Sequence, residues 1–94
     1  MLQQSDLHRT IARVQRMELY FDILQDAFRN TPDSLHSHGP FREILQILTR
    51  YYEDGQWLSD YELDEQGLLP RDLKRGVLSQ DALYDLLCII HQQK

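Results

Sequence analysis

One stretch of the chain decides the fold, namely Tyr51–Leu87, which reads YYEDGQWLSDYELDEQGLLPRDLKRGVLSQDALYDLL. Four residues that interrupt regular structure divide it: Gly55, Gly67, Pro70 and Gly76. Glycine commonly ends a helix in the left-handed conformation, and proline fits the first turn of the next helix. Their spacing predicts a short helix over 56–65, one to two helical turns over 70–76, and a last helix capped by Ser79.

Upstream of this stretch, apolar side chains recur at every third or fourth position, which is typical of a helix with one buried stripe. The stripe consists of Leu7, Ile11, Val14, Met17, Phe21, Leu24 and Phe28. It predicts a long helix over about 6–29. Turn-forming residues predict a loop over 31–39, and the nearly continuous apolar side of 40–54 predicts a second long helix, the most buried.

No segment of alternating polarity indicates a strand. The predicted fold class is therefore all-α: a small helical bundle of about four helices, two long and two shorter, plus a short helical turn. The length of 94 residues leaves room for one domain at most, so 1–94 is interpreted as a single helical domain.

Several features favour a cytoplasmic protein. No apolar run approaches the roughly 18 residues that span a membrane, and the first residues lack the pattern of a secretory signal. The single cysteine, Cys88, excludes an intramolecular disulfide and a cysteine-based zinc site. We therefore expect a cytoplasmic location and no contact with a membrane.

Charge is distributed unevenly along the chain. Residues 1–50 balance to zero, whereas 51–94 carry the whole net charge of −5, and 51–69 contain six carboxylates without a basic residue. A surface of this kind repels phosphate backbones. The segment around Gly76 superficially resembles a helix-turn-helix, but its second helix offers carboxylates where DNA readers carry basic side chains. Nucleic acid is therefore not expected as a partner.

The acidic and aromatic segment 51–69 is interpreted as the binding surface of a non-catalytic interaction or regulatory module. Its expected partner is a protein with a basic surface, because tryptophan and tyrosine are enriched at interface hot spots and carboxylates attract Arg and Lys. Tyr51 and Trp57 are expected to belong to the core. The candidate contact residues are Tyr52, Asp60, Tyr61, Glu62 and Glu65.

Two of these candidates rank first. Trp57, Leu58 and Tyr61 share one side of the short helix and are expected to face the core. Glu62 and Glu65 should then lie on its outer face, where they can meet a partner.

The alternative is a small enzyme or a divalent-metal protein built on Asp60 and Asp64. These residues stand four positions apart, so a helix would place both carboxylates on one face, and oxygen ligands suit divalent cations. No nucleophile and base, phosphate-binding loop or cofactor motif accompanies them. We therefore expect neither enzymatic activity nor a cofactor.

Lys74 and Arg75 follow the acidic segment and lie between Pro70 and Gly76. A short rigid turn could direct them toward Asp60, Asp64 or Glu18. We interpret both as structural charge partners and not as phosphate-binding residues.

The chain also resembles the small bacterial proteins grouped as domain of unknown function 4298. The residues that carry the resemblance are Arg13–Glu18, Tyr51, Tyr52, Trp57, Asp60–Glu62, Asp64, Glu65, Gly67, Pro70, Leu73–Ser79, Asp81 and Tyr84. The resemblance covers most of the chain. It implies a compact, cytoplasmic, bacterial helical protein and carries over no activity, cofactor or catalytic residue.

Overall fold

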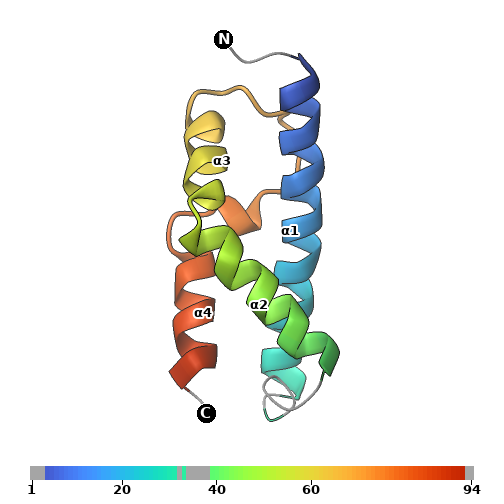
Figure 1. The fold of residues 1–94 in the computed structure, drawn as a ribbon, viewed down its shortest axis with the longest axis vertical. Helices are drawn as coiled ribbons and strands as arrows, with labels where there is room; N and C mark the ends of the chain where they lie inside the picture. The colour runs from blue at the N-terminus through green and yellow to red at the C-terminus, as the bar shows by residue number, and fades with distance from the viewer. Residues whose placement is uncertain (1–3, 32, 34–38, 93–94) are drawn as a thin grey trace.

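The computed structural model describes residues 4–31, 33 and 39–92 (Figure 1). Over these residues it contains four α-helices and one 3-10 turn, and no strand. The elements are α1 (Gln4–Asn30), α2 (Gly39–Glu53), α3 (Gln56–Glu65), η2 (Gly76–Leu78) and α4 (Ala82–Gln92). The predicted all-α class, with two long and two shorter helices and a helical turn, is confirmed.

The helices surround one core. In Figure 1, α1 runs along the length of the molecule, α2 crosses it diagonally, and α3 and α4 lie one above the other beside them. The predicted stripe of α1 supplies Val14, Met17, Phe21 and Leu24 to this core. The largest fully buried apolar side chains of the other helices are Leu48 in α2 and Leu83 and Ile90 in α4.

Glycine sets the ends of α3, whose bounds agree with the prediction. Gly55 precedes the helix with a φ of 91° and Gly67 follows it with a φ of 74°, both left-handed. The amide of Gly67 donates to the carbonyl of Asp64 at 2.9 Å, and that of Leu68 donates to Leu63 at 3.1 Å. This pair of bonds is a Schellman motif, which satisfies carbonyls at the end of the helix.

The helical turn predicted over 70–76 was placed too early. That segment forms bends with one turn bond, from the amide of Leu73 to the carbonyl of Pro70 at 3.2 Å, and the 3-10 turn follows it. The turn lies there because Val77 and Leu78 are buried in the core. Ser79 is extended, with a ψ of 137°, as the residue before a helix commonly is, but residues 80 and 81 form a turn, so α4 begins at Ala82, two residues later than a helix capped by Ser79 would.

One core assignment in α3 was wrong. Leu58, expected to face inward, is 51% exposed. The helix buries Trp57, as predicted, and Asp60 in place of Leu58. Trp57 and Asp60 are three residues apart and share one face of the helix, and Leu58 lies outside that face.

Of the predicted loop 31–39, the structure describes Thr31, Asp33 and Gly39, and Gly39 already belongs to α2. Across the described ranges, no helix is both long and apolar enough to cross a membrane.

Candidate functional site

A buried carboxylate joins three helices. Asp60 of α3 is 0% exposed, and both of its oxygens accept hydrogen bonds from Arg13 of α1, Oδ2 from Nε at 2.9 Å and Oδ1 from Nη2 at 2.6 Å. The hydroxyl of Tyr51 in α2 donates to Oδ2 at 2.7 Å. Burying a charge is costly unless it is paired and hydrogen-bonded, and this carboxylate is both.

Arg13 and Tyr51 both hold their protons firmly in this cluster. The hydrogen bond with Asp60 raises the pKa of Arg13, against the opposing effect of partial burial. Burial first, and then the hydrogen bond to Asp60, raises the pKa of Tyr51 far above its usual value. Arg13 therefore stays protonated and Tyr51 keeps its proton at any physiological pH.

Asp60 was predicted as a contact residue for a partner, and the structure contradicts this assignment. A fully buried side chain cannot meet a partner at the surface, and its oxygens are already occupied by Arg13 and Tyr51. Sequence alone could not separate this carboxylate from its neighbours, because its cationic partner lies 47 positions away.

Asp64 is also engaged, through Arg75. The guanidinium of Arg75 forms an ion pair with Asp64 through Nη1, donates to the carbonyl of Pro70 through Nη2, and donates to the carbonyl of Leu73 through Nε at 3.2 Å. The prediction that Arg75 is a structural charge partner is confirmed. Asp60 and Asp64, the two carboxylates of the alternative interpretation, thus bond to different arginines.

Lys74 behaves differently from Arg75. It is exposed and makes no ion pair with another described residue. Glu18, named as its possible partner, accepts a hydrogen bond from the backbone amide of Val77 at 2.7 Å instead. The prediction for Lys74 was therefore wrong, and Glu18 holds η2 against α1. The described residues contain no group of three or more side chains that could hold a metal ion.

Four aromatic rings form a continuous row across three helices. The ring centroids of Tyr84 and Tyr52 are 5.7 Å apart, those of Tyr52 and Trp57 are 5.2 Å apart, and those of Trp57 and Tyr61 are 5.1 Å apart. The last pair is stacked, with an interplanar angle of 16°. These distances lie in the range of favourable aromatic contacts. We call Tyr84, Tyr52, Trp57 and Tyr61 the aromatic row.

The row is anchored in the core and open to solvent. Trp57 is buried and its indole Nε1 donates to the carbonyl of Val77 at 2.8 Å. Together with the burial of Tyr51, this confirms the core prediction for both residues. Tyr52 and Tyr61 are half-buried, and Tyr84 is 49% exposed.

Carboxylates border the aromatic row. The pKa of Tyr61 is raised, first by the negative charge of Glu65 and in smaller measure by Asp64 and Asp81. The pKa of Tyr84 is also raised, first by its hydrogen bond with Cys88 and in smaller measure by Tyr52 and Asp85. We define the acidic–aromatic face as the aromatic row together with Glu65, Asp81 and Asp85.

Glu62 lies elsewhere on α3. It is exposed, as predicted, but it lines a shallow hollow together with Leu58, Ser59, Leu63 and Gln66. Glu65 neighbours Tyr61. The two glutamates are three positions apart and so stand next to each other on the exposed side of α3, but of the two only Glu65 neighbours Tyr61.

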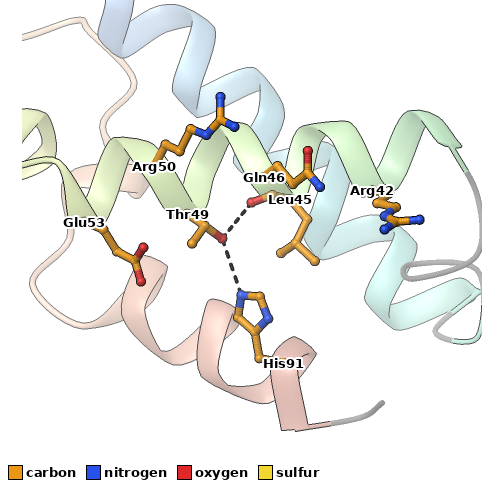
Figure 2. A pocket seen from close by; sticks show the side chains of 7 residues that line it. All are labelled: Arg42, Leu45, Gln46, Thr49, Arg50, Glu53 and His91. Carbon is orange, nitrogen blue, oxygen red and sulfur yellow. Dashed lines mark hydrogen bonds between the residues drawn. The ribbon is translucent and has the colours of Figure 1, made fainter.

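A groove between α2 and α4 adjoins the face. One hollow of about 340 Å³ is lined by Tyr52 and Tyr84 together with Glu53. A second, of about 750 Å³, continues along α2 as far as Arg42 (Figure 2). Figure 2 shows His91 of α4 directed at Thr49 of α2, with 3.4 Å between its Nε2 and the threonine Oγ1.

Comparison with known proteins identifies the family. The family model described as Domain of unknown function (DUF4298) matches residues 14–93. The chain belongs to this family. No curated protein and no solved structure matches the chain.

The match covers the whole acidic–aromatic face, the groove and most of α1. It begins one residue after Arg13, the partner of the buried Asp60. Membership of DUF4298 assigns no activity.

The contact candidates chosen from the sequence do not include Arg42, Glu53 or Tyr84. A signal was present in α2, where Arg42, Gln46, Thr49 and Glu53 recur at helical spacing and so share one side. That stripe is polar, so apolar periodicity does not mark it.

Proposed function

We propose that this protein is a non-catalytic interaction module that binds a basic segment of a partner protein on the acidic–aromatic face. The observation that carries the proposal is the aromatic row, in which rings from three helices touch and remain partly exposed beside carboxylates. Tyr52, Tyr61 and Glu65 remain contact candidates from the sequence, and Tyr84 joins them.

Physical chemistry supports a basic partner. Tyrosine and tryptophan provide large contact areas at a low cost in conformational entropy, and they attract the cations of Arg and Lys through their ring faces. Rings held by α2, α3 and α4 are ordered before binding, which reduces the entropy lost on association. The carboxylates at the border would speed the encounter with a positively charged segment.

The non-catalytic part of the proposal rests on the ion pairs of the two aspartates. Asp60 is occupied by Arg13 and Tyr51, and Asp64 by Arg75. Both oxygens of Asp60 and one oxygen of Asp64 already accept from arginine or tyrosine, which favours a structural role for the two carboxylates. We further propose a bacterial cytoplasm as the setting, on the family resemblance and on the single cysteine of the sequence.

Two charge reversals on the same helix test the proposal. Glu65→Lys lies on the acidic–aromatic face, and Glu62→Lys makes the same change of charge beside the hollow of Leu58 and Gln66, which no ring of the aromatic row lines. Both should keep the helical circular dichroism and the melting temperature, because both sites are exposed. In pull-downs from host lysate at physiological salt, Glu65→Lys should reduce recovery of the partner several-fold, and Glu62→Lys should recover it as the wild type does.

Surface plasmon resonance with the purified partner should attribute the loss to slower association. If wild type, Glu62→Lys and Glu65→Lys recover the same proteins in equal amounts, the acidic–aromatic face is only a solvated surface and the proposal is wrong.

A further inference from the structure

A groove between α2 and α4 continues from the acidic–aromatic face at Tyr52 and Tyr84. The hollow beneath Tyr52 and Tyr84 is also lined by Thr49, Glu53 and His91. The same three residues line the larger hollow that continues along α2. The two hollows therefore form one groove between α2 and α4, which opens at one end onto the aromatic row.

The two ends of this groove differ in charge. Glu53 lies at the aromatic end, and Arg42 lies at the far end of α2 (Figure 2). Arg42 is exposed and forms no ion pair with another described residue. Arg50 also borders the groove, but Figure 2 shows its guanidinium on the side of α2 away from His91. The groove is thus negative and aromatic at one end and positive at the other.

The middle of the groove offers polar atoms to a bound chain. The hydroxyl of Thr49 donates to the carbonyl of Leu45 at 2.7 Å, so its oxygen is left to accept from Nε2 of His91. That arrangement leaves Nδ1 of His91 as an acceptor, and the amide of Gln46 supplies both a donor and an acceptor. These groups can pair with the backbone of an extended peptide.

We propose that the partner segment lies along this groove in an extended conformation, with an arginine against Tyr52, Tyr84 and Glu53 and a carboxylate beside Arg42. This inference rests on the proposed function and deepens it by specifying the partner's sequence. Arginine fits the aromatic end better than lysine because a planar guanidinium can stack on a ring and at the same time bond a carboxylate through two donors.

The geometry also fixes a spacing. Arg42 and Glu53 are eleven positions apart in α2. At 1.5 Å per residue this separation is about 16 Å along the helix axis. An extended chain advances about 3.3 Å per residue, so the acid and the arginine of the partner should be about five residues apart.

Synthetic peptides test the inference with the intact protein. The reference peptide carries glutamate and arginine five residues apart in an otherwise Gly/Ser sequence. Matched peptides replace the glutamate by glutamine, the arginine by citrulline, or the arginine by lysine, and one reduces the spacing to two. Binding is measured by titration followed by NMR, which reports the rings of Tyr52 and Tyr84 directly.

Each lost charge should weaken binding about 1.5- to 5-fold, as expected for exposed ion pairs. The lysine and short-spacing peptides should also bind more weakly than the reference. Glu53→Gln should weaken the reference peptide and leave the citrulline peptide unchanged, and Arg42→Gln should weaken the reference and leave the glutamine peptide unchanged. Glu62→Gln is the control and should change nothing.

The groove inference is overturned if the reference peptide does not bind at millimolar concentration, or if Glu53→Gln and Arg42→Gln act equally on charged and uncharged peptides. The proposed function can fail separately. If the peptide results hold but Glu65→Lys leaves partner capture intact, the groove is a binding site and the wider acidic–aromatic face is not. If Glu65→Lys abolishes capture while the groove variants have no effect, the face stands and the groove inference falls.

Discussion

At the scale of single residues, long-range pairing decides which polar side chains are structural. Among the six carboxylates of 51–69, Asp60 is the one that the core encloses, and its partner Arg13 lies in a distant helix. No local pattern marks this choice, since every acid in the segment has the same chemistry. The aromatic residues were easier to assign, because Tyr51 and Trp57 stand at positions that apolar periodicity already directs inward.

Asp60→Asn tests the role of the buried carboxylate. The substitution keeps the shape but removes the charge that holds Arg13, whose side chain is 28% exposed and can regain only part of its hydration. Breaking a buried pair on one side costs several kcal/mol, so with this partial exposure we expect a loss of about 2–3 kcal/mol in the free energy of unfolding. Urea denaturation followed by circular dichroism measures it.

The control for this measurement is Glu62→Gln, which removes one negative charge from an exposed site and should stay within about 0.5 kcal/mol of wild type. A loss for Asp60→Asn that is no larger than the loss for Glu62→Gln would contradict the structural role of the cluster.

At the scale of elements, the sequence predicts helices well where glycine or helical periodicity defines them. The bounds of α3 agree with the prediction because Gly55 and Gly67 both take the left-handed conformation. The segment after Gly67 was predicted less well, since its path depends on Glu18 of α1. The carboxylate of Glu18 accepts a hydrogen bond from the backbone amide of Val77, which is 59 positions further along the chain. Local signals cannot supply a contact of that length.

Gly67→Ala tests the end of α3. A φ of 74° strains any residue with a Cβ atom, although the site has open space around it. We expect a loss of about 1 kcal/mol in the free energy of unfolding. Gly39→Ala is the matched control, because that glycine has no neighbour within 4 Å and no left-handed φ. Its effect on urea denaturation should be neutral or slightly stabilising, and equal losses for the two variants would contradict the Schellman assignment.

At the scale of the whole molecule, the uneven charge of the sequence takes on two separate roles. Some acids of the C-terminal half serve the fold, as Asp60 and Asp64 do through their arginines. Others, such as Glu65 and Asp81, are exposed beside the aromatic row. The sequence predicted the acidic and aromatic character of this surface, but the division between structural and exposed acids depends on Arg13 and Arg75, which lie outside α3.

The contacts of α1 bear on whether residues 1–94 act as one domain. α1 contacts α2, α4 and η2, and the Arg13–Asp60 pair ties it to α3 as well. Elements joined in this way should unfold together, as small single domains usually do. Trp57 provides a local probe near the meeting point of α2, α3 and η2, whereas circular dichroism reports all the helices, with the largest share from the 27 residues of α1.

We therefore predict that tryptophan fluorescence and far-ultraviolet circular dichroism give the same midpoint in urea. In a two-state transition, probes that see different parts of the molecule must coincide. Asp60→Asn should lower both midpoints equally, because the ion pair stabilises the whole unit and not α3 alone. If fluorescence of Trp57 changes at a lower urea concentration than the helical signal, α3 unfolds ahead of α1. The aromatic row would then belong to a less stable part of the fold. Its rings would not be held in place before binding, as the proposed binding face requires.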